Sequence, residues 1–173
     1  EASMNAAAAT LLQTFHQQPK LALLISCVGR KLILGKRIDE ETLGKEDPKY
    51  AITLINLGVL YKNMGNFEKA EQLFFDAISI DEKTIGKNHP DYATDLICLA
   101  NLYYDKGNYE KGEPLYLTAL QIVQKVFGKQ HPQYATVLHN LAGLYAEMGN
   151  YEKSEPFYLE SKTIRERTLG KEH

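Results

Sequence analysis

The sequence predicts an all-α protein in which antiparallel helix pairs stack into a solenoid. The main observation is a unit that recurs every 42 residues, marked by Gly44, Gly86, Gly128 and Gly170, each followed by a lysine. Two further observations are a pair of helical apolar stripes within each unit and a Gly-Asn turn between them. A unit of this size buries its apolar face only against its neighbours, so the units share a continuous core.

The first helix of each unit is predicted to begin at a proline. In the first unit, Asp47 can accept hydrogen bonds from the free amides of a helix start, and Pro48 suits the first helical position because its missing N–H would have no partner there. Apolar and small residues then recur at steps of three and four, which forms one buried stripe. These residues are Leu54, Leu57, Gly58 and Tyr61; Leu96, Leu99, Ala100 and Tyr103; and Leu138, Leu141, Ala142 and Tyr145.

The second helix follows a short turn. Gly65 suits the left-handed residue that ends a helix, and Asn66 can cap the next one; Gly107 and Gly149 repeat the turn. The buried stripe of the second helix in the first unit comprises Phe67, Ala70, Leu73, Phe74 and Ala77. Pro114 and Pro156 fall inside the equivalent helices of the later units, where we expect a kink rather than a break.

The units resemble the tetratricopeptide repeat (TPR), in the long variant found in kinesin light chain. The resemblance depends on these stripes and on the lead-in Gly-Lys-x-His-Pro-x-Tyr-Ala, over residues 43–168. The departures are Asp47 in place of His, Gly112 and Ser154 in place of Ala, and Cys98 where the family favours Asn. The resemblance implies a right-handed superhelix whose first helices line the concave side, and binding of protein partners rather than catalysis.

The predicted organisation is three full repeats with a partial repeat at each end. The full repeats span 43–84, 85–126 and 127–168. Residues 1–42 are predicted to form a degenerate helical repeat or cap, and residues 169–173 to begin a further, truncated repeat. We therefore expect the chain to be a fragment of a longer protein, with Phe157, Tyr158 and Ile164 left uncovered. The alternative is that a second copy covers them in a homodimer.

Composition disfavours several classes of partner. The net charge is −2 with both signs interspersed, which argues against nucleic acid because that partner needs Lys and Arg gathered on one face. The longest apolar run, 21–28, falls far short of the roughly 20 residues that cross a bilayer. Cys27 and Cys98 both lie in apolar helical sequence, which fits small core or groove residues in a reducing, cytoplasmic setting.

The resemblance also implies a peptide-binding groove. Its most informative positions are Asn56, Cys98 and Asn140, because an amide offers both a donor and acceptors to the backbone of a bound extended peptide. The alternative is that Asn56 and Asn140 only satisfy polar groups on neighbouring helices. The other predicted groove residues are Thr94, Asn101, Thr136, His139, Tyr104, Asn63 and Asp105. No basic clamp for a C-terminal carboxylate is present among the groove positions.

No catalytic, metal or cofactor site is predicted. His89, His131 and His173 recur at one period, but equivalent atoms of stacked repeats lie about 10 Å apart, too far to share a zinc ion. Paired glutamates at the start of each second helix suit the helix dipole better than acid–base chemistry. Cys98 and His139 could be a nucleophile and base, but no third residue is placed to orient them.

The predicted function is therefore a scaffold or adaptor that binds an extended segment of a partner protein along the concave groove. The alternative is a regulatory or sensing module of a larger signalling enzyme, either a caspase-like protease or an NTPase.

Overall fold

A computed structural model describes residue 44 and residues 47–169 of the 173-residue chain. These residues form six α-helices and no strands. The helices are α3 (Pro48–Asn63), α4 (Phe67–Thr84), α5 (Pro90–Asp105), α6 (Tyr109–Phe127), α7 (Pro132–Glu147) and α8 (Tyr151–Leu169). The predicted cap at 1–42 and the predicted further repeat after Leu169 lie outside the described residues.

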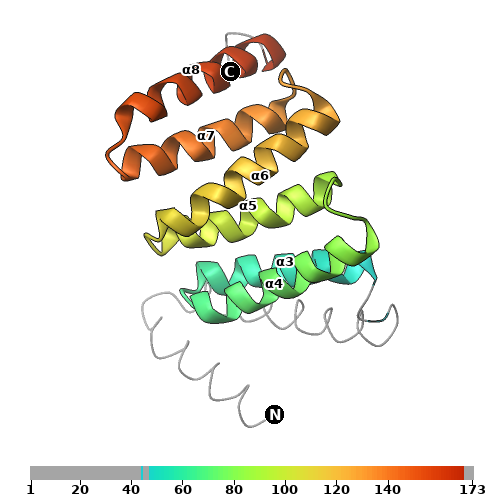
Figure 1. Cartoon of the computed structure of the whole chain (residues 1–173). Helices are drawn as coiled ribbons and strands as arrows, with labels where there is room; N and C mark the ends of the chain where they lie inside the picture. Colours follow the sequence, from blue (N-terminus) through green and yellow to red (C-terminus); the bar gives the residue numbers. More distant parts are fainter. Residues whose placement is uncertain (1–43, 45–46, 170–173) are drawn as a thin grey trace, which may run out of the picture.

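The helices form three hairpins that stack in chain order (Figure 1). Within the hairpins α3 packs against α4, α5 against α6 and α7 against α8. Between hairpins α4 packs against α5 and α6 against α7, and smaller contacts join α3 to α5 and α5 to α7. The prediction of an all-α solenoid of antiparallel helix pairs is therefore confirmed.

The lead-in residues cap the first helix of each hairpin. The Asp47 carboxylate accepts a hydrogen bond from the Lys49 amide at 2.7 Å, as predicted. His89 and His131 occupy the same position in the next two hairpins, and each Nδ1 accepts the amide N–H two residues further on at 3.2 Å. His89 and His131 therefore have a structural role as N-caps, whereas His173 lies outside the described residues.

The turn inside each hairpin depends on a glycine with positive φ, at 75° for Gly65 and 73° for Gly149. The following asparagine caps the second helix in two hairpins, since Asn66 and Asn150 accept an amide N–H at 3.3 and 3.2 Å. The expected cap at Asn108 is wrong. The backbone there (φ −95°, ψ 67°) closely matches that of Asn66, but the Asn108 side chain makes no capping hydrogen bond.

Small residues allow the two helices of each hairpin to cross closely. A Cβ atom added at Gly58 would lie 2.5 Å from the ring of Phe74, which is fully buried. At the equivalent of Ala70 in the third hairpin, the Ser154 hydroxyl donates to the carbonyl of Ala142 at 2.8 Å. The prolines predicted to bend the second helices do not break them, because α6 and α8 each continue through their proline.

Neighbouring hairpins are joined by buried tyrosines that reach glutamates of the preceding hairpin. The Tyr103 hydroxyl donates to Glu71 at 2.7 Å, and the Tyr145 hydroxyl donates to Glu113 at 2.5 Å. The sequence prediction gave these glutamates a role at the helix start only. That role is incomplete, because Glu71 and Glu113 each lie one turn further along and bond to the next hairpin.

The outer face of α8 is only partly as predicted. Ile164 is 2% exposed, so the expectation that it is uncovered is wrong: it packs into the cluster shared with α7. Phe157 stacks on Tyr145 with ring centroids 5.8 Å apart. Tyr158, by contrast, is 37% exposed.

Among the described residues, no helix has both the length and the apolarity that crossing a membrane requires.

Candidate functional site

Four helices line a small, open pocket of about 210 Å³. Residues of α5 and α7 line it from the first helices of their hairpins, and one tyrosine each from α6 and α8 completes it. The lining residues are Asn101, Tyr104, Tyr116, His139, Asn140, Gly143 and Tyr158. A concave site with a few convergent polar groups is the usual form of a binding site.

The pocket brings together four of the ten predicted groove residues, namely Asn101, Tyr104, His139 and Asn140. Within the described part of the chain, neither the side-chain amide of Asn140 nor the hydroxyl of Tyr158 has a hydrogen-bond partner. Asn140 is half-buried, so its side chain remains accessible to a ligand. These free donors and acceptors are suited to bind a peptide backbone.

The other six predicted residues do not line this pocket. Thr94 and Thr136 bond back to the carbonyls of Pro90 and Pro132 at 3.1 Å each. The remaining four are Asn56, Asn63, Cys98 and Asp105, of which Asp105 is paired with Lys62 at 2.5 Å. Asn56 lies at the position equivalent to Asn140, but on α3, and it is exposed.

Two tyrosine hydroxyls of the pocket are already bonded within the fold. The Tyr116 hydroxyl donates to the side-chain oxygen of Asn101, and the Tyr104 hydroxyl donates to Glu147 at 3.5 Å. Burial raises the pKa of Tyr116 above its usual range, so its phenol stays protonated. The side-chain oxygen of Asn101 is therefore already satisfied within the fold.

Gly143 keeps the pocket open. A Cβ atom at this position would lie 3.4 Å from the Tyr158 hydroxyl and 4.0 Å from the Tyr104 hydroxyl. Any larger side chain would extend into the space between these two phenols. The absence of a side chain at Gly143 is therefore the feature of α7 that creates room for a ligand group.

The pocket carries no strong charge. His139 is exposed and packs edge-on against Tyr158, with ring centroids 5.2 Å apart. Partial burial of the ring against its neighbours, and secondarily the nearby Arg165 guanidinium, lower the pKa of His139 below its usual value. The imidazole is consequently neutral at pH 7, and the lining suits an uncharged segment better than an acidic tail.

Cys98 has the properties of an unreactive thiol. Burial, followed by the neighbouring carboxyl of Asp95, raises the pKa of Cys98 to about 11. The thiolate, which is the nucleophilic form, is therefore scarce at neutral pH. Cys98 also lies outside the pocket that contains His139, so the nucleophile and base considered from sequence are not brought together there.

Sequence reasoning did not identify two pocket residues, Tyr116 and Tyr158. Both occupy the position of Phe74 in their repeats, which the apolar pattern assigns to the core. The available signal was the change from phenylalanine to tyrosine, because a hydroxyl at a core position requires a partner or an opening. Tyr116 has such a partner in Asn101.

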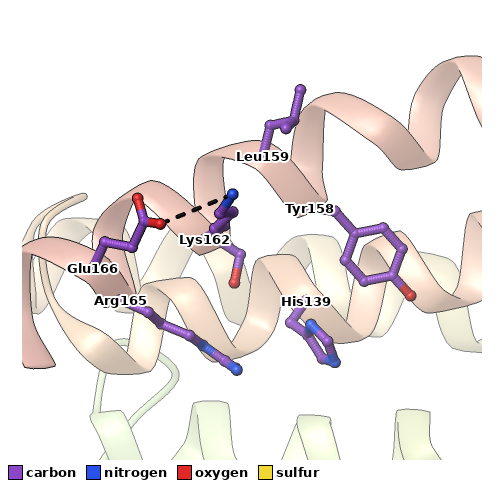
Figure 2. Close-up of a pocket in the computed structure, with 7 residues that line it drawn as sticks. His139, Tyr158, Leu159, Lys162, Arg165 and Glu166 are labelled. Atoms are coloured by element: carbon purple, nitrogen blue, oxygen red, sulfur yellow. Dashed lines mark ion pairs between the residues drawn. The ribbon is translucent and has the colours of Figure 1, made fainter. Parts of the chain in front are cut away.

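A second pocket, of about 430 Å³, adjoins the first and shares His139 and Tyr158 with it. It lies along α8, where Leu159, Lys162, Arg165 and Glu166 border it (Figure 2).

Comparison with known proteins identifies the family. The sequence model described as "Tetratricopeptide repeat" matches residues 49–104 and 93–167, which together cover more than half of the chain. No protein of curated function matches the chain significantly. Members of this repeat family generally serve as scaffolds for protein–protein interactions, and the comparisons give no support to a regulatory module of a protease or NTPase.

Solved structures share the fold. BtubC (BKLC) from P. vanneervenii superposes with a TM-score of 0.77 at 24% identity, covering 86% of this chain and 59% of its own. A Podosopora anserina protein described as a kinesin light chain with nearly identical TPR-like repeats gives a TM-score of 0.71 at 20% identity, covering 96% and 85%. The chain thus spans less than two thirds of BtubC. The chain belongs to the tetratricopeptide repeat family, and its fold is the kinesin light chain-like TPR solenoid.

Proposed function

We propose that this chain is a non-enzymatic scaffold that holds an extended segment of a partner protein against α5 and α7. The observation that carries the proposal is the pocket around Gly143, where the Asn140 amide and the Tyr158 hydroxyl lack partners within the described residues. An extended segment presents one N–H and one C=O per residue. The side-chain amide of Asn140 can therefore bind the backbone of such a segment whatever its sequence.

The pocket also favours a particular kind of side chain. Three of its lining residues are tyrosines, namely Tyr104, Tyr116 and Tyr158, and its volume is about 210 Å³. An uncharged apolar or aromatic side chain of the partner would fill this space, while Asn140 bonds to the adjacent backbone. Binding of this kind depends on a few main-chain contacts and one anchor, so we expect modest affinity.

Replacement of Asn140 tests the proposal, with Asn56 as a matched control. Peptides selected from a random displayed library against the whole chain would serve as probes. Asn140→Ala should weaken their binding about tenfold, the equivalent of one or two lost hydrogen bonds. Asn56→Ala should have no effect, because Asn56 has the equivalent position but lies outside the pocket.

Thermal melting of the same variants separates binding from stability. The Asn140 side chain is half-buried and makes no recorded hydrogen bond within the fold, so Asn140→Ala should leave the melting temperature within about 2 °C of the parent. A lower melting temperature with unchanged peptide affinity would show that Asn140 is structural and would refute its contact role.

A further inference from the structure

A carboxylate without a cationic partner lies at the edge of the pocket around Gly143. The Tyr104 hydroxyl lies 4.0 Å from the position of a Gly143 Cβ and donates to Glu147 at 3.5 Å. A single phenol oxygen therefore separates the open space above Gly143 from the Glu147 carboxylate. Glu147 is exposed, and no lysine, arginine or histidine among the described residues is paired with it.

The preceding repeat has a lysine at the equivalent place. Tyr104 on α5 occupies the position that Lys62 has on α3, and Glu147 on α7 occupies that of Asp105 on α5 in the same register. The Lys62 ammonium lies 2.5 Å from the Asp105 carboxylate, so that charge is neutralised from within the chain. Tyr104 gives Glu147 only a long hydrogen bond from a neutral phenol. The change from lysine to tyrosine thus leaves one negative charge uncompensated beside the pocket.

Another glutamate of this chain binds a tyrosine hydroxyl and a cation at the same time. Glu71 accepts the Tyr103 hydroxyl on Oε1 at 2.7 Å and the Lys106 ammonium on Oε2 at 3.1 Å. Tyr104 likewise uses Oε1 of Glu147, and Oε2 accepts no hydrogen bond from the described residues. Since each carboxylate oxygen is an acceptor, a cation can bind Glu147 without displacing the tyrosine.

The charge of Glu147 acts on the pocket itself. Burial, and then the charge of Glu147, raise the pKa of Tyr104 above its usual value. Of the described residues that line the pocket, none is a lysine or arginine. Arg165 lowers the pKa of His139, but His139 lies two turns of α7 before Glu147. A cationic group of a ligand is therefore favoured at the Glu147 end of the pocket.

We propose that the segment bound at this pocket carries a lysine or arginine next to its apolar anchor, and that Glu147 binds this basic side chain. The inference rests on the proposed function and names the kind of segment that the groove selects. Gly143 and Glu147 are about 6 Å apart along α7, and an extended chain advances about 3.3 Å per residue. The basic residue therefore lies one or two positions from the side chain that fills the pocket.

A charge cycle between chain and peptide tests this inference. Peptides selected from a random displayed library against the whole chain should be enriched in lysine and arginine beside an apolar residue, and selection against Glu147→Lys should remove the enrichment. Replacing the basic residue of a selected peptide by methionine should weaken binding to the parent about fivefold, the equivalent of one exposed ion pair. The same replacement should have no effect on binding to Glu147→Gln.

Asp105→Asn is the matched control for Glu147→Gln. It neutralises the equivalent carboxylate of the preceding repeat, which Lys62 already pairs. Peptide affinity should therefore stay within about twofold of the parent in Asp105→Asn, whereas Glu147→Gln should lower it about fivefold. Glu147→Gln retains an acceptor for the Tyr104 hydroxyl, so its melting temperature should stay within about 2 °C of the parent.

Two results would overturn the inference. It fails if the peptides selected against the parent show no excess of basic residues, or if the methionine replacement weakens binding to the parent and to Glu147→Gln equally. Asn140→Ala separates this failure from failure of the groove proposal. If Asn140→Ala weakens peptide binding and Glu147→Gln does not, the groove proposal holds and the basic contact is wrong. The opposite pattern would support the basic contact and refute the contact with the Asn140 amide.

Discussion

The side chains of Asp81 on α4 and Asp95 on α5 lie against each other in the interface between the first two hairpins and share a hydrogen bond. They are 2% and 4% exposed, and Asp81 Oδ1 and Asp95 Oδ2 have no hydrogen-bond partner among residues 47–169. Two carboxylates this close cannot both ionise without a large cost, so the pair holds a proton. The equivalent residues of the next interface are Val123 and Val137, both fully buried.

The acidic pair predicts a pH-dependent stability. Burial, and then the charge of Asp81, raise the pKa of Asp95 to about 8, and burial also raises the pKa of Asp81. Asp91 adds to the rise for both groups, whereas His89 opposes it for Asp81. Because the folded state binds a proton that the unfolded state releases near pH 4, this contribution is complete below pH 4 and is lost as the pH rises to about 8.

Valine at both positions is the natural control for this effect, because the next interface already uses it. Asp81→Val with Asp95→Val should remove the decline in stability between pH 5 and pH 8. The double variant should also be more stable than the parent at pH 8, by about 1 to 4 kcal/mol. Urea unfolding of both proteins at the two pH values measures this; parallel declines would show that other groups cause the pH dependence.

The bond from Tyr145 to Glu113 should couple the second and third hairpins. Tyr145→Phe and Glu113→Gln should each destabilise the fold, and a double-mutant cycle should give a coupling of about 1 to 2 kcal/mol, because the acceptor is charged. The same cycle on Tyr103 and Glu71 should give less, since Lys106 also bonds to Glu71 at 3.1 Å and retains part of its interaction. Additive effects at both sites would contradict a role in joining hairpins.

Gly58→Ala should destabilise the first hairpin. Alanine favours the helix by about 1 kcal/mol over glycine, but its Cβ would overlap the Phe74 ring, and overpacking of a core costs about 1 to 3 kcal/mol. The expected net result is a loss of about 1 kcal/mol in chemical unfolding. In a Phe74→Leu background the ring is absent, so the same substitution should be neutral or stabilising; an equal loss in both backgrounds would exclude the steric explanation.

Cys98 should react slowly with iodoacetamide. With a pKa of about 11, its thiolate fraction at pH 7.5 is far below that of a free cysteine. Mass spectrometry of the Cys98 peptide would follow the rate in the native protein, with the urea-unfolded chain as the reference. A native rate equal to or above the unfolded rate would contradict the assignment of Cys98 as a partly buried, unreactive thiol.

The fold could be predicted because its signals lie within one unit and recur. The Asp47 cap, the Gly65 turn and the stripe that contains Leu54 each depend on neighbours a few residues away, and repetition removes chance matches. The Asp81–Asp95 and Tyr145–Glu113 contacts cross from one unit to the next. Their prediction requires the stacking register, which periodicity alone does not give.

The candidate site was predicted less well for a similar reason. The resemblance predicted which face of the first helices forms the groove, and two of the residues predicted from it, Asn140 and His139, line the pocket. The pocket itself is defined by Tyr116 and Tyr158, which reach it from second helices, and by the missing side chain of Gly143. These features depend on packing between helices, so a pattern along one helix does not reveal them.

The most direct test of the proposed groove is an amide NMR titration of the chain with a library-selected peptide. If the peptide lies against α5 and α7, the largest shift changes should map to residues around Asn101–Tyr104 and His139–Gly143. Asn140→Ala should reduce them severalfold at a peptide concentration near the Kd of the parent. Shift changes confined to α4 and α6, or unchanged by Asn140→Ala, would contradict the groove as the binding site.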